Sequence, residues 1–107
     1  MSFNIKVSGR FKKQIKRLSK KHNSLKNDFE LFLNSLAENP SQGKPLGNNC
    51  FKIRLAITSK GKGKSGGARV ITHVQVINNT IYLLSIYDKS EQNTITDKEI
   101  KEILGSF

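Results

Sequence analysis

Alternating apolar and polar residues predict two neighbouring strands in the second half of the chain. In the first, Phe51, Ile53, Leu55 and Ile57 alternate with Lys52, Arg54, Ala56 and Thr58. In the second, Val70, Val74 and Val76 alternate with Arg69, His73 and Gln75. A period of two is typical of a strand that buries one face. A Gly/Lys/Ser loop, residues 59–67, separates the two strands.

A third strand follows a predicted hairpin. Asn78 and Asn79 suggest a two-residue turn, because asparagine tolerates the positive φ that such turns need. The stretch from Ile81 to Tyr87 is apolar on both faces until Ser85 and Tyr87, which favours a place inside the sheet. The three strands would bury one face and carry a polar set on the other, namely Lys52, Arg54, Arg69, His73, Ser85 and Tyr87.

The first half of the chain predicts one short strand and two helices. Phe3, Ile5 and Val7 alternate with polar residues, and a helical stripe of Phe11, Ile15 and Leu18 follows. Asn23-Ser24 can cap a second helix, which ends before Asn39-Pro40; its apolar residues are Leu25, Phe29, Phe32, Leu33 and Leu36. Only a short turn separates the two predicted helices. It predicts that they form an antiparallel helical hairpin packed on one face of the sheet.

The remaining segments are a loop and a last helix. Residues 40–49 contain both prolines and are predicted to be a loop. Thr96 and Glu99 form a capping box for a short helix that ends at Gly105. The chain thus reads as one α+β domain over residues 1–107. Its order is β-α-α-β-β-β-α, with a twisted, mainly antiparallel sheet.

Charge changes this picture more than composition does. The chain of 107 residues is 36% hydrophobic, enough for a modest core, and has a formal charge of +11. No Asp or Glu occurs between Asn39 and Tyr87, whereas residues 50–77 carry six Lys or Arg. A basic sheet face with no acid suits a polyanion, first nucleic acid and second an acidic protein. Six basic residues also line the first helix, as a solvated face or a docking surface; they are Lys12, Lys13, Lys16, Arg17, Lys20 and Lys21.

Several classes of protein are disfavoured. There is one cysteine, Cys50, and no apolar run near the ~20 residues that cross a bilayer. We therefore expect a cytoplasmic protein with no membrane contact. His22 and His73 lie far apart in the chain, so no metal and no other cofactor is expected. No Ser-His-Asp set, acidic pair or phosphate-loop motif followed by a helix is present.

The basic face could instead support RNA cleavage by the RNA's own 2′-OH. Arg54 and Arg69 on adjacent strands could hold one phosphate, because planar guanidinium groups match its oxygens. Tyr87 and His73 could stack a base or transfer a proton. Each also has a structural alternative. Tyr87 could close the edge of the core with its hydroxyl in water, His73 could be an exposed strand residue, and Arg54 could pair with Asp88 or Glu91.

Two segments carry a resemblance to a known family. The run KIRLAITSKGKGKSGGARVI, followed by IYLLSIYDKSEQ, resembles the HigB-type branch of the RelE/ParE superfamily of bacterial toxins. The order of elements fits that fold over nearly the whole chain. The resemblance implies a type II toxin that cleaves mRNA in the ribosomal A site, where it also meets rRNA, and that a cognate antitoxin protein neutralises.

The resemblance also implies site residues. Carried over by position, the active-site region holds Arg54, Arg69, Tyr87 and Lys89, and the basic loop holds Lys60, Lys62 and Lys64. We add Lys52, His73 and Glu91 as RNA contacts; His73 stands where relatives carry an aromatic residue, and the role of Glu91 is open. Alternative functions are a ParE-like toxin that inhibits a topoisomerase by binding, an RNA-binding module without cleavage, and a relative that retains only antitoxin binding.

Overall fold

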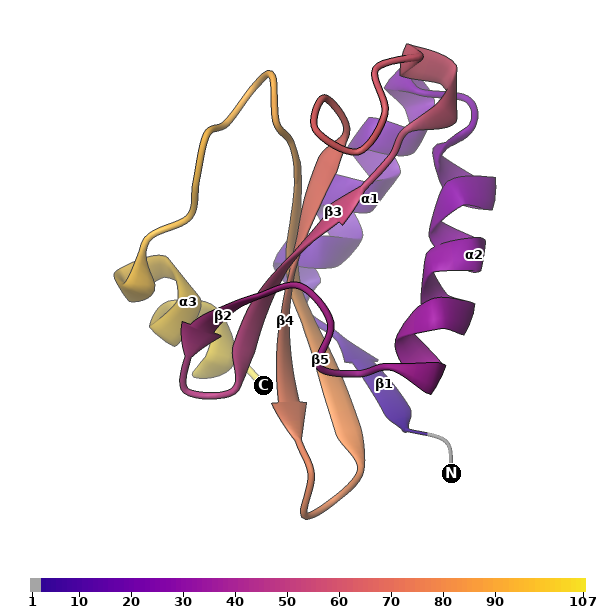
Figure 1. The fold of residues 1–107 in the computed structure, drawn as a ribbon. Helices are drawn as coiled ribbons and strands as arrows, with labels where there is room; N and C mark the ends of the chain where they lie inside the picture. Colours follow the sequence, from indigo (N-terminus) through magenta and orange to yellow (C-terminus); the bar gives the residue numbers. More distant parts are fainter. Residues whose placement is uncertain (1–2) are drawn as a thin grey trace.

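A five-stranded sheet with the strand order β1-β5-β4-β3-β2 forms the centre of the molecule (Figure 1). The structure is a computed structural model, and it describes residues 3–107. The strands are β1 (Asn4–Val7), β2 (Lys44–Gly47), β3 (Cys50–Leu55), β4 (Ala68–Gln75) and β5 (Thr80–Asp88). β1 runs parallel to β5, and the other neighbours are antiparallel. The third predicted strand is confirmed as an interior strand, since β5 pairs on both sides.

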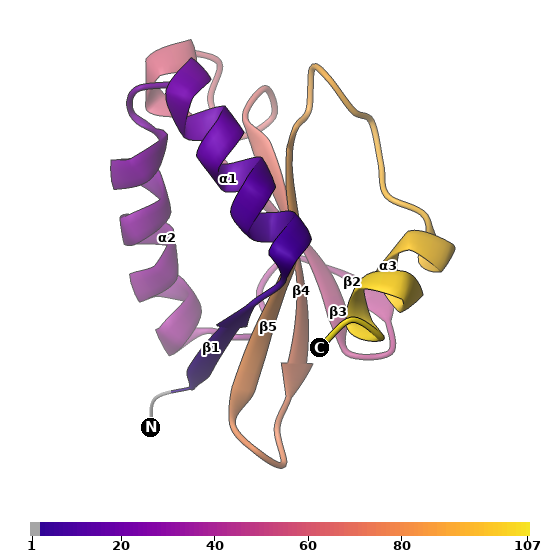
Figure 2. The ribbon, with the colours of Figure 1, turned by 180° about the vertical axis from the view of Figure 1, so that it is seen from behind.

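The three predicted helices are confirmed. They are α1 (Gly9–Lys21), α2 (Leu25–Glu38) and α3 (Asp97–Leu104), and a 3-10 turn, η1 (Thr58–Lys60), follows β3. The Ser8 hydroxyl accepts a hydrogen bond from the Phe11 amide at 2.9 Å, and Thr96 and Glu99 form the predicted capping box. Seen from behind, α1 and α2 lie together over one face of the sheet (Figure 2). The α+β class and the helical hairpin are therefore as expected.

Two apolar clusters hold these layers together. Side chains of α1 and α2 pack with one face of the sheet around Phe11, Leu18 and Phe32. On the opposite face, α3 packs Ile100 and Ile103 against Ile71, Leu84 and Tyr87. α3 thus covers one part of the face that the sequence predicts to be polar. The other part, beside β3 and residues 59–67, stays open; we name residues 59–67 the Lys-rich loop.

Two local predictions are wrong. Residues 40–49 are not wholly a loop, because β2 pairs with β3 and forms the sheet edge. The β4–β5 hairpin has four residues outside the ladder, since Gln75 pairs with Thr80. Only Asn79 takes a positive φ, of 50°, whereas a two-residue type I′ turn needs two such residues. Val76 is consequently 69% exposed and not on the buried face.

Candidate nucleic-acid-binding and active site

The strand register brings three of the predicted site residues into one row. Arg54 of β3 pairs with Arg69 of β4, and Arg69 pairs with Tyr87 of β5. In the next row, Lys52 lies opposite Ile71. Side chains two positions apart on a strand share a face, so Lys52 and Arg54 point to the same side. Residues from three strands are thus placed together as the alternation predicts.

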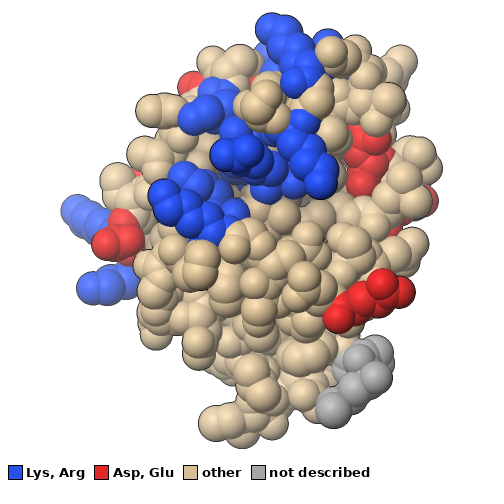
Figure 3. Space-filling model, in the orientation of Figure 1, with Lys and Arg blue, Asp and Glu red and all other residues tan. Residues whose placement is uncertain are grey.

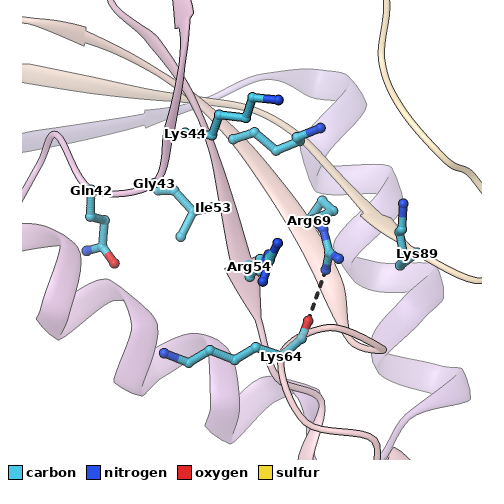
Figure 4. Close-up of a pocket in the computed structure, with 9 residues that line it drawn as sticks. Gln42, Gly43, Lys44, Ile53, Arg54, Lys64, Arg69 and Lys89 are labelled. Atoms are coloured by element: carbon cyan, nitrogen blue, oxygen red, sulfur yellow. Dashed lines mark hydrogen bonds between the residues drawn. The ribbon is translucent and has the colours of Figure 1, made fainter.

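A pocket of about 610 Å³ opens on this face (Figure 4). Six basic side chains line it, from β2, β3, the Lys-rich loop, β4 and the segment after β5. They are Lys44, Lys52, Arg54, Lys64, Arg69 and Lys89. No carboxylate among residues 3–107 lines it. On the face seen in Figure 3, Lys and Arg gather in a patch over this region, while Asp and Glu lie toward the margins of the view. We name this site the cationic pocket.

Arg69 is held in place by the Lys-rich loop. Its Nη1 donates to the carbonyl oxygens of Lys64 at 3.0 Å and Ala68 at 3.1 Å. Its Nη2 donates to the Ser65 carbonyl oxygen at 3.1 Å. A guanidinium has five N–H donors, and these bonds use three of them. The Nε–H and one Nη2–H remain, which are the two donors needed to hold a phosphate in a forked geometry.

Arg54 has no ion-pair partner among the described residues. Its side chain is exposed, and neither Asp88 nor Glu91 pairs with it within residues 3–107. Asp88 accepts instead from Lys60, and Glu91 from Arg17 and Lys21. The alternative in which Arg54 forms a surface ion pair with either acid is therefore excluded. Its full guanidinium is available to a ligand.

Asp88 anchors the base of the Lys-rich loop. It is 1% exposed and accepts from Lys60 Nζ at 2.8 Å and from the Ser90 hydroxyl at 2.7 Å. His22 Nε2 lies 3.1 Å from its other oxygen. Burial alone would raise the pKa of Asp88, but hydrogen bonds from Lys60, Ser90 and His22 outweigh it and hold the pKa far below its usual range. Lys60 is thereby directed into the protein and does not line the cationic pocket.

A second carboxylate fixes the start of the same loop. Asp28 of α2 accepts from the Thr58 amide at 2.9 Å and the Thr58 hydroxyl at 2.6 Å. Burial raises the pKa of Asp28, yet the bonds from Thr58 and Ser24 lower it by more. The loop thus lies between two buried acids, with Lys62 and Lys64 exposed at its tip. Of the three loop lysines, only Lys64 lines the cationic pocket.

Lys52 lies in a partly buried and positively charged environment. Burial lowers its pKa, and the nearby charges of Lys44, Lys89, Arg69 and Arg54 lower it further. A lysine in such surroundings releases its proton more readily than one in water. This makes Lys52 a candidate for proton transfer as well as for RNA contact.

Tyr87 lies beneath the surface of the site. It is 3% exposed, and its hydroxyl has no hydrogen-bond partner within residues 3–107. Burial raises the pKa of the phenol; nearby Arg69 opposes this shift and Glu99 adds to it. The hydroxyl is therefore not in water, contrary to the structural alternative considered for it. Tyr87 packs with Ile95 and α3, on the covered side of Arg69.

His73 and Glu91 lie apart from the cationic pocket. His73 is 8% exposed, and its ring lies 5.9 Å from that of Tyr82 and 3.4 Å, at Nδ1, from Cys50 Sγ. The exposed-strand alternative for His73 is wrong, because the face is covered at this point. Glu91 accepts from Arg17 at 2.8 Å, and this bond, followed by that from Lys21, lowers the pKa of Glu91 to about 2. Ser85, expected on the polar face, donates instead to Gln14 Oε1 at 3.0 Å.

Sequence reasoning missed three residues of the pocket wall. Gln42, Gly43 and Lys44 line it, and all three fall in the segment predicted to be a loop. Gly43 has a φ of +98°, and a Cβ there would lie 2.6 Å from the Lys52 carbonyl oxygen. Only glycine permits this close approach, which brings Lys44 alongside Lys52. The signal that the sequence offers is the glycine directly before the one lysine of residues 40–49.

Within residues 3–107, no helix is both long and apolar enough to traverse a bilayer. No three His, Cys, Asp or Glu side chains of the described residues meet in a geometry that could hold a metal ion. The chemistry of the site is that of clustered cations on a sheet.

A family model for the RelE toxin of the RelE/RelB toxin–antitoxin system matches residues 10–105. The chain belongs to the RelE toxin family. Its fold is similar to that of Escherichia coli toxin RelE in the free state, solved as a double arginine-to-alanine mutant. That match has a TM-score of 0.66 and 18% identity, and covers 98% of this chain and 97% of the other.

Two further solved structures share the fold. One is the RelBE2 toxin–antitoxin complex of Mycobacterium tuberculosis, with a TM-score of 0.61, 16% identity, and coverage of 82% of this chain and 99% of the other. The second is the conserved hypothetical protein HP0892 of Helicobacter pylori, with a TM-score of 0.55, 20% identity, and coverage of 83% and 97%. The RelE-like fold predicted from the sequence is confirmed.

Proposed function

We propose that this RelE-family toxin is a ribosome-dependent endoribonuclease that cleaves mRNA in the A site and so blocks translation. The observation that carries the proposal is the cationic pocket, in which six basic side chains converge with no carboxylate among the described residues that line it. Such a pocket attracts the RNA backbone. It also stabilises the extra negative charge of a pentavalent phosphorane, since preorganised donors act best where charge develops.

The proposed reaction uses the RNA's own 2′-oxygen. The 2′-OH loses its proton, and its oxygen attacks the adjacent phosphorus. The bond from phosphorus to the 5′-oxygen breaks, which leaves a 2′,3′-cyclic phosphate and a 5′-hydroxyl that gains a proton. Arg54 and the two remaining donors of Arg69 hold the phosphate oxygens. The neutral amine form of Lys52, which its lowered pKa favours, takes the 2′ proton. Lys89, which lines the pocket, donates a proton to the leaving 5′-oxygen.

The other predicted residues take different parts in this proposal. Lys62 and Lys64 at the exposed loop tip contact RNA phosphates. Lys60 supports them from within through Asp88. The Tyr87 hydroxyl is buried, so it can contact a base or transfer a proton only when Ile95 and α3, which pack on Tyr87, move away. His73 and Glu91 have structural contacts that need no RNA.

The partners follow from the same proposal. A cognate antitoxin protein neutralises the toxin, and the M. tuberculosis RelBE2 complex, which has this fold, is a toxin–antitoxin complex. mRNA and the ribosomal A site, with its rRNA, are the proposed substrate and platform, in the cytoplasm. Within the superfamily, the HigB-like branch remains our assignment from the motifs IYLLSIYDKSEQ and SKGKGKSGGARVI.

The test is primer extension on a defined mRNA incubated with the toxin, with and without translating ribosomes. We expect cuts only with ribosomes. Arg54→Ala should reduce the cleavage rate by about 10²–10³-fold, as loss of one charge-stabilising donor does. It should leave thermal stability unchanged, because the Arg54 side chain is exposed. Lys12→Ala on α1 is the matched control, since it removes an exposed cation outside the pocket.

Three outcomes would contradict the proposal in different ways. Full activity of Arg54→Ala would overturn the site. Cuts on naked RNA would indicate a ribonuclease that needs no ribosome. No cleavage by the folded protein in either condition would favour a toxin that acts by binding, which a topoisomerase assay would then test.

A further inference from the structure

A second, less polar groove adjoins the cationic pocket on the side of α2. It has a volume of about 250 Å³, smaller than the ~300–1,000 Å³ of sites that take drug-sized ligands. Its walls come from α2, the end of β3 and the start of η1. Four of the lining residues are apolar, namely Leu31, Phe32, Leu55 and Ala56. We name it the α2 groove.

The two sites are continuous through shared residues. Gln42, Arg54 and Lys64 line both the cationic pocket and the α2 groove. In Figure 4 the Lys64 side chain extends past Arg54 toward the side on which Gln42 lies. Because the two sites adjoin, a ligand with an anionic part and a flat, weakly polar part could place one part in each site.

The groove offers apolar contact and one unused acceptor. Leu31 is 62% exposed and lines the groove, so its aliphatic side chain is accessible to a ligand there. Gln42 Nε2 donates to the Asn39 carbonyl oxygen at 3.1 Å, and Gln42 Oε1 accepts no hydrogen bond within residues 3–107. Asp28 is already engaged by Thr58 and Ser24, so its oxygens are not offered to a ligand.

We propose that the α2 groove is a nucleobase subsite for the nucleotide whose phosphate lies in the cationic pocket. Nucleotides join an anionic phosphate to a flat ring with polar edges, which matches the paired sites. The Arg54 guanidinium, common to both, can bind phosphate with its edge and stack on the base with its plane. Gln42 Oε1 can accept from a base N–H, so Gln42 and Leu31 would bias which bases are held beside the cut.

The base subsite rests on the proposed function only in that a phosphate of RNA is taken to lie in the cationic pocket. The test of the subsite does not use cleavage. Amide chemical shifts of the full chain are followed by NMR during titration with adenosine 3′-monophosphate, its cytidine, guanosine and uridine counterparts, and inorganic phosphate. Phosphate should shift amides around Lys52, Arg54 and Arg69. Nucleotides should also shift amides of Leu31, Phe32 and Gln42, and at least one should bind about tenfold more tightly than phosphate.

A matched pair of variants sharpens this test. Leu31→Ser should weaken nucleotide binding by about threefold and leave phosphate binding unchanged, because the lost contact is apolar. Val76→Ser removes a similarly exposed aliphatic side chain at the β4–β5 hairpin, which does not line the groove. This variant should change neither nucleotide binding nor phosphate binding. Equal affinity for nucleotide and phosphate, or equal effects of the two variants, would overturn the subsite. Absence of ribosome-dependent cleavage would instead count only against the proposed activity.

Discussion

Tyr87 is the residue at which the cost of one buried hydroxyl can be measured. Its side chain is 3% exposed, and its hydroxyl makes no hydrogen bond with any of the described residues. A buried polar group without a partner costs about 1–3 kcal/mol. Ile95, Ile100 and Ile103 pack with Tyr87, and nearby Arg69 makes no hydrogen bond with the hydroxyl.

Tyr87→Phe should therefore stabilise the protein by about 1 kcal/mol, because it removes an unpaired buried hydroxyl and keeps the ring. Urea unfolding measures this change. If the hydroxyl takes part in proton transfer or base contact, ribosome-dependent cleavage should fall in the same variant. A toxin that acts by binding alone would tolerate the change. Loss of stability in Tyr87→Phe would show that the hydroxyl has a partner in solution.

The Lys-rich loop is the element on which the site depends, and two buried acids hold it. Asp88 binds Lys60 from below, and Asp28 binds Thr58 beside α2. Arg69 completes the attachment from the third side through Lys64 and Ser65. A glycine-rich segment with three lysines would otherwise sample many conformations. These bonds place Lys64 at the rim of the cationic pocket.

Asp88→Asn should destabilise the protein by about 3–5 kcal/mol, because Lys60 would keep its charge while largely buried. Glu91→Gln is the matched control. Glu91 also binds two cations of the protein, Arg17 and Lys21, but at the surface, so its loss should cost less than about 1 kcal/mol. Urea unfolding of both variants at pH 7 measures the difference. Equal losses would mean that burial does not set the strength of the Asp88 anchor.

The same two variants should also differ in how their stability depends on pH. The folded-state pKa of Asp88 is lowered, so its contribution is complete above the unfolded-state value of about 3.9 and is lost as the pH falls below it. The loss of stability between pH 7 and pH 3 should therefore be smaller in Asp88→Asn than in the wild type. In Glu91→Gln it should nearly match the wild type, because solvent screens the exposed pair. An unchanged acid dependence in Asp88→Asn would contradict the anchor.

Sequence patterns predicted elements better than the contacts between them. The row of Arg54, Arg69 and Tyr87 follows from strand periodicity, which fixes faces. Periodicity does not say which part of a face another element covers. α3 covers the end that holds His73 and leaves the end that holds Arg54 open. The place of Lys44 could not be predicted, because β2 is only four residues long and contains both a proline and a glycine.

At the scale of the whole molecule, the positive charge has two separate locations. The cationic pocket gathers six basic residues on the sheet face, while Lys12, Lys13 and Lys16 are exposed on α1. α1 packs on the opposite side of the sheet through Phe11 and Leu18. Net charge alone would attract any polyanion to either surface. A ligand of a few nucleotides can reach only one of them, so the two can be distinguished.

Salt dependence makes that distinction measurable. Each phosphate contact to single-stranded RNA contributes about −0.7 to the slope of log K against log salt. For a four-nucleotide RNA, replacing Lys44, Lys52 and Lys89 with alanine should reduce the slope by up to about 2 units. Replacing Lys12, Lys13 and Lys16 with alanine removes the same charge from α1 and should leave the slope nearly unchanged. Fluorescence anisotropy between 50 and about 200 mM salt measures both. Equal reductions of the slope by the two sets of substitutions would mean that overall charge holds short RNA. The cationic pocket would then not be the RNA-binding site.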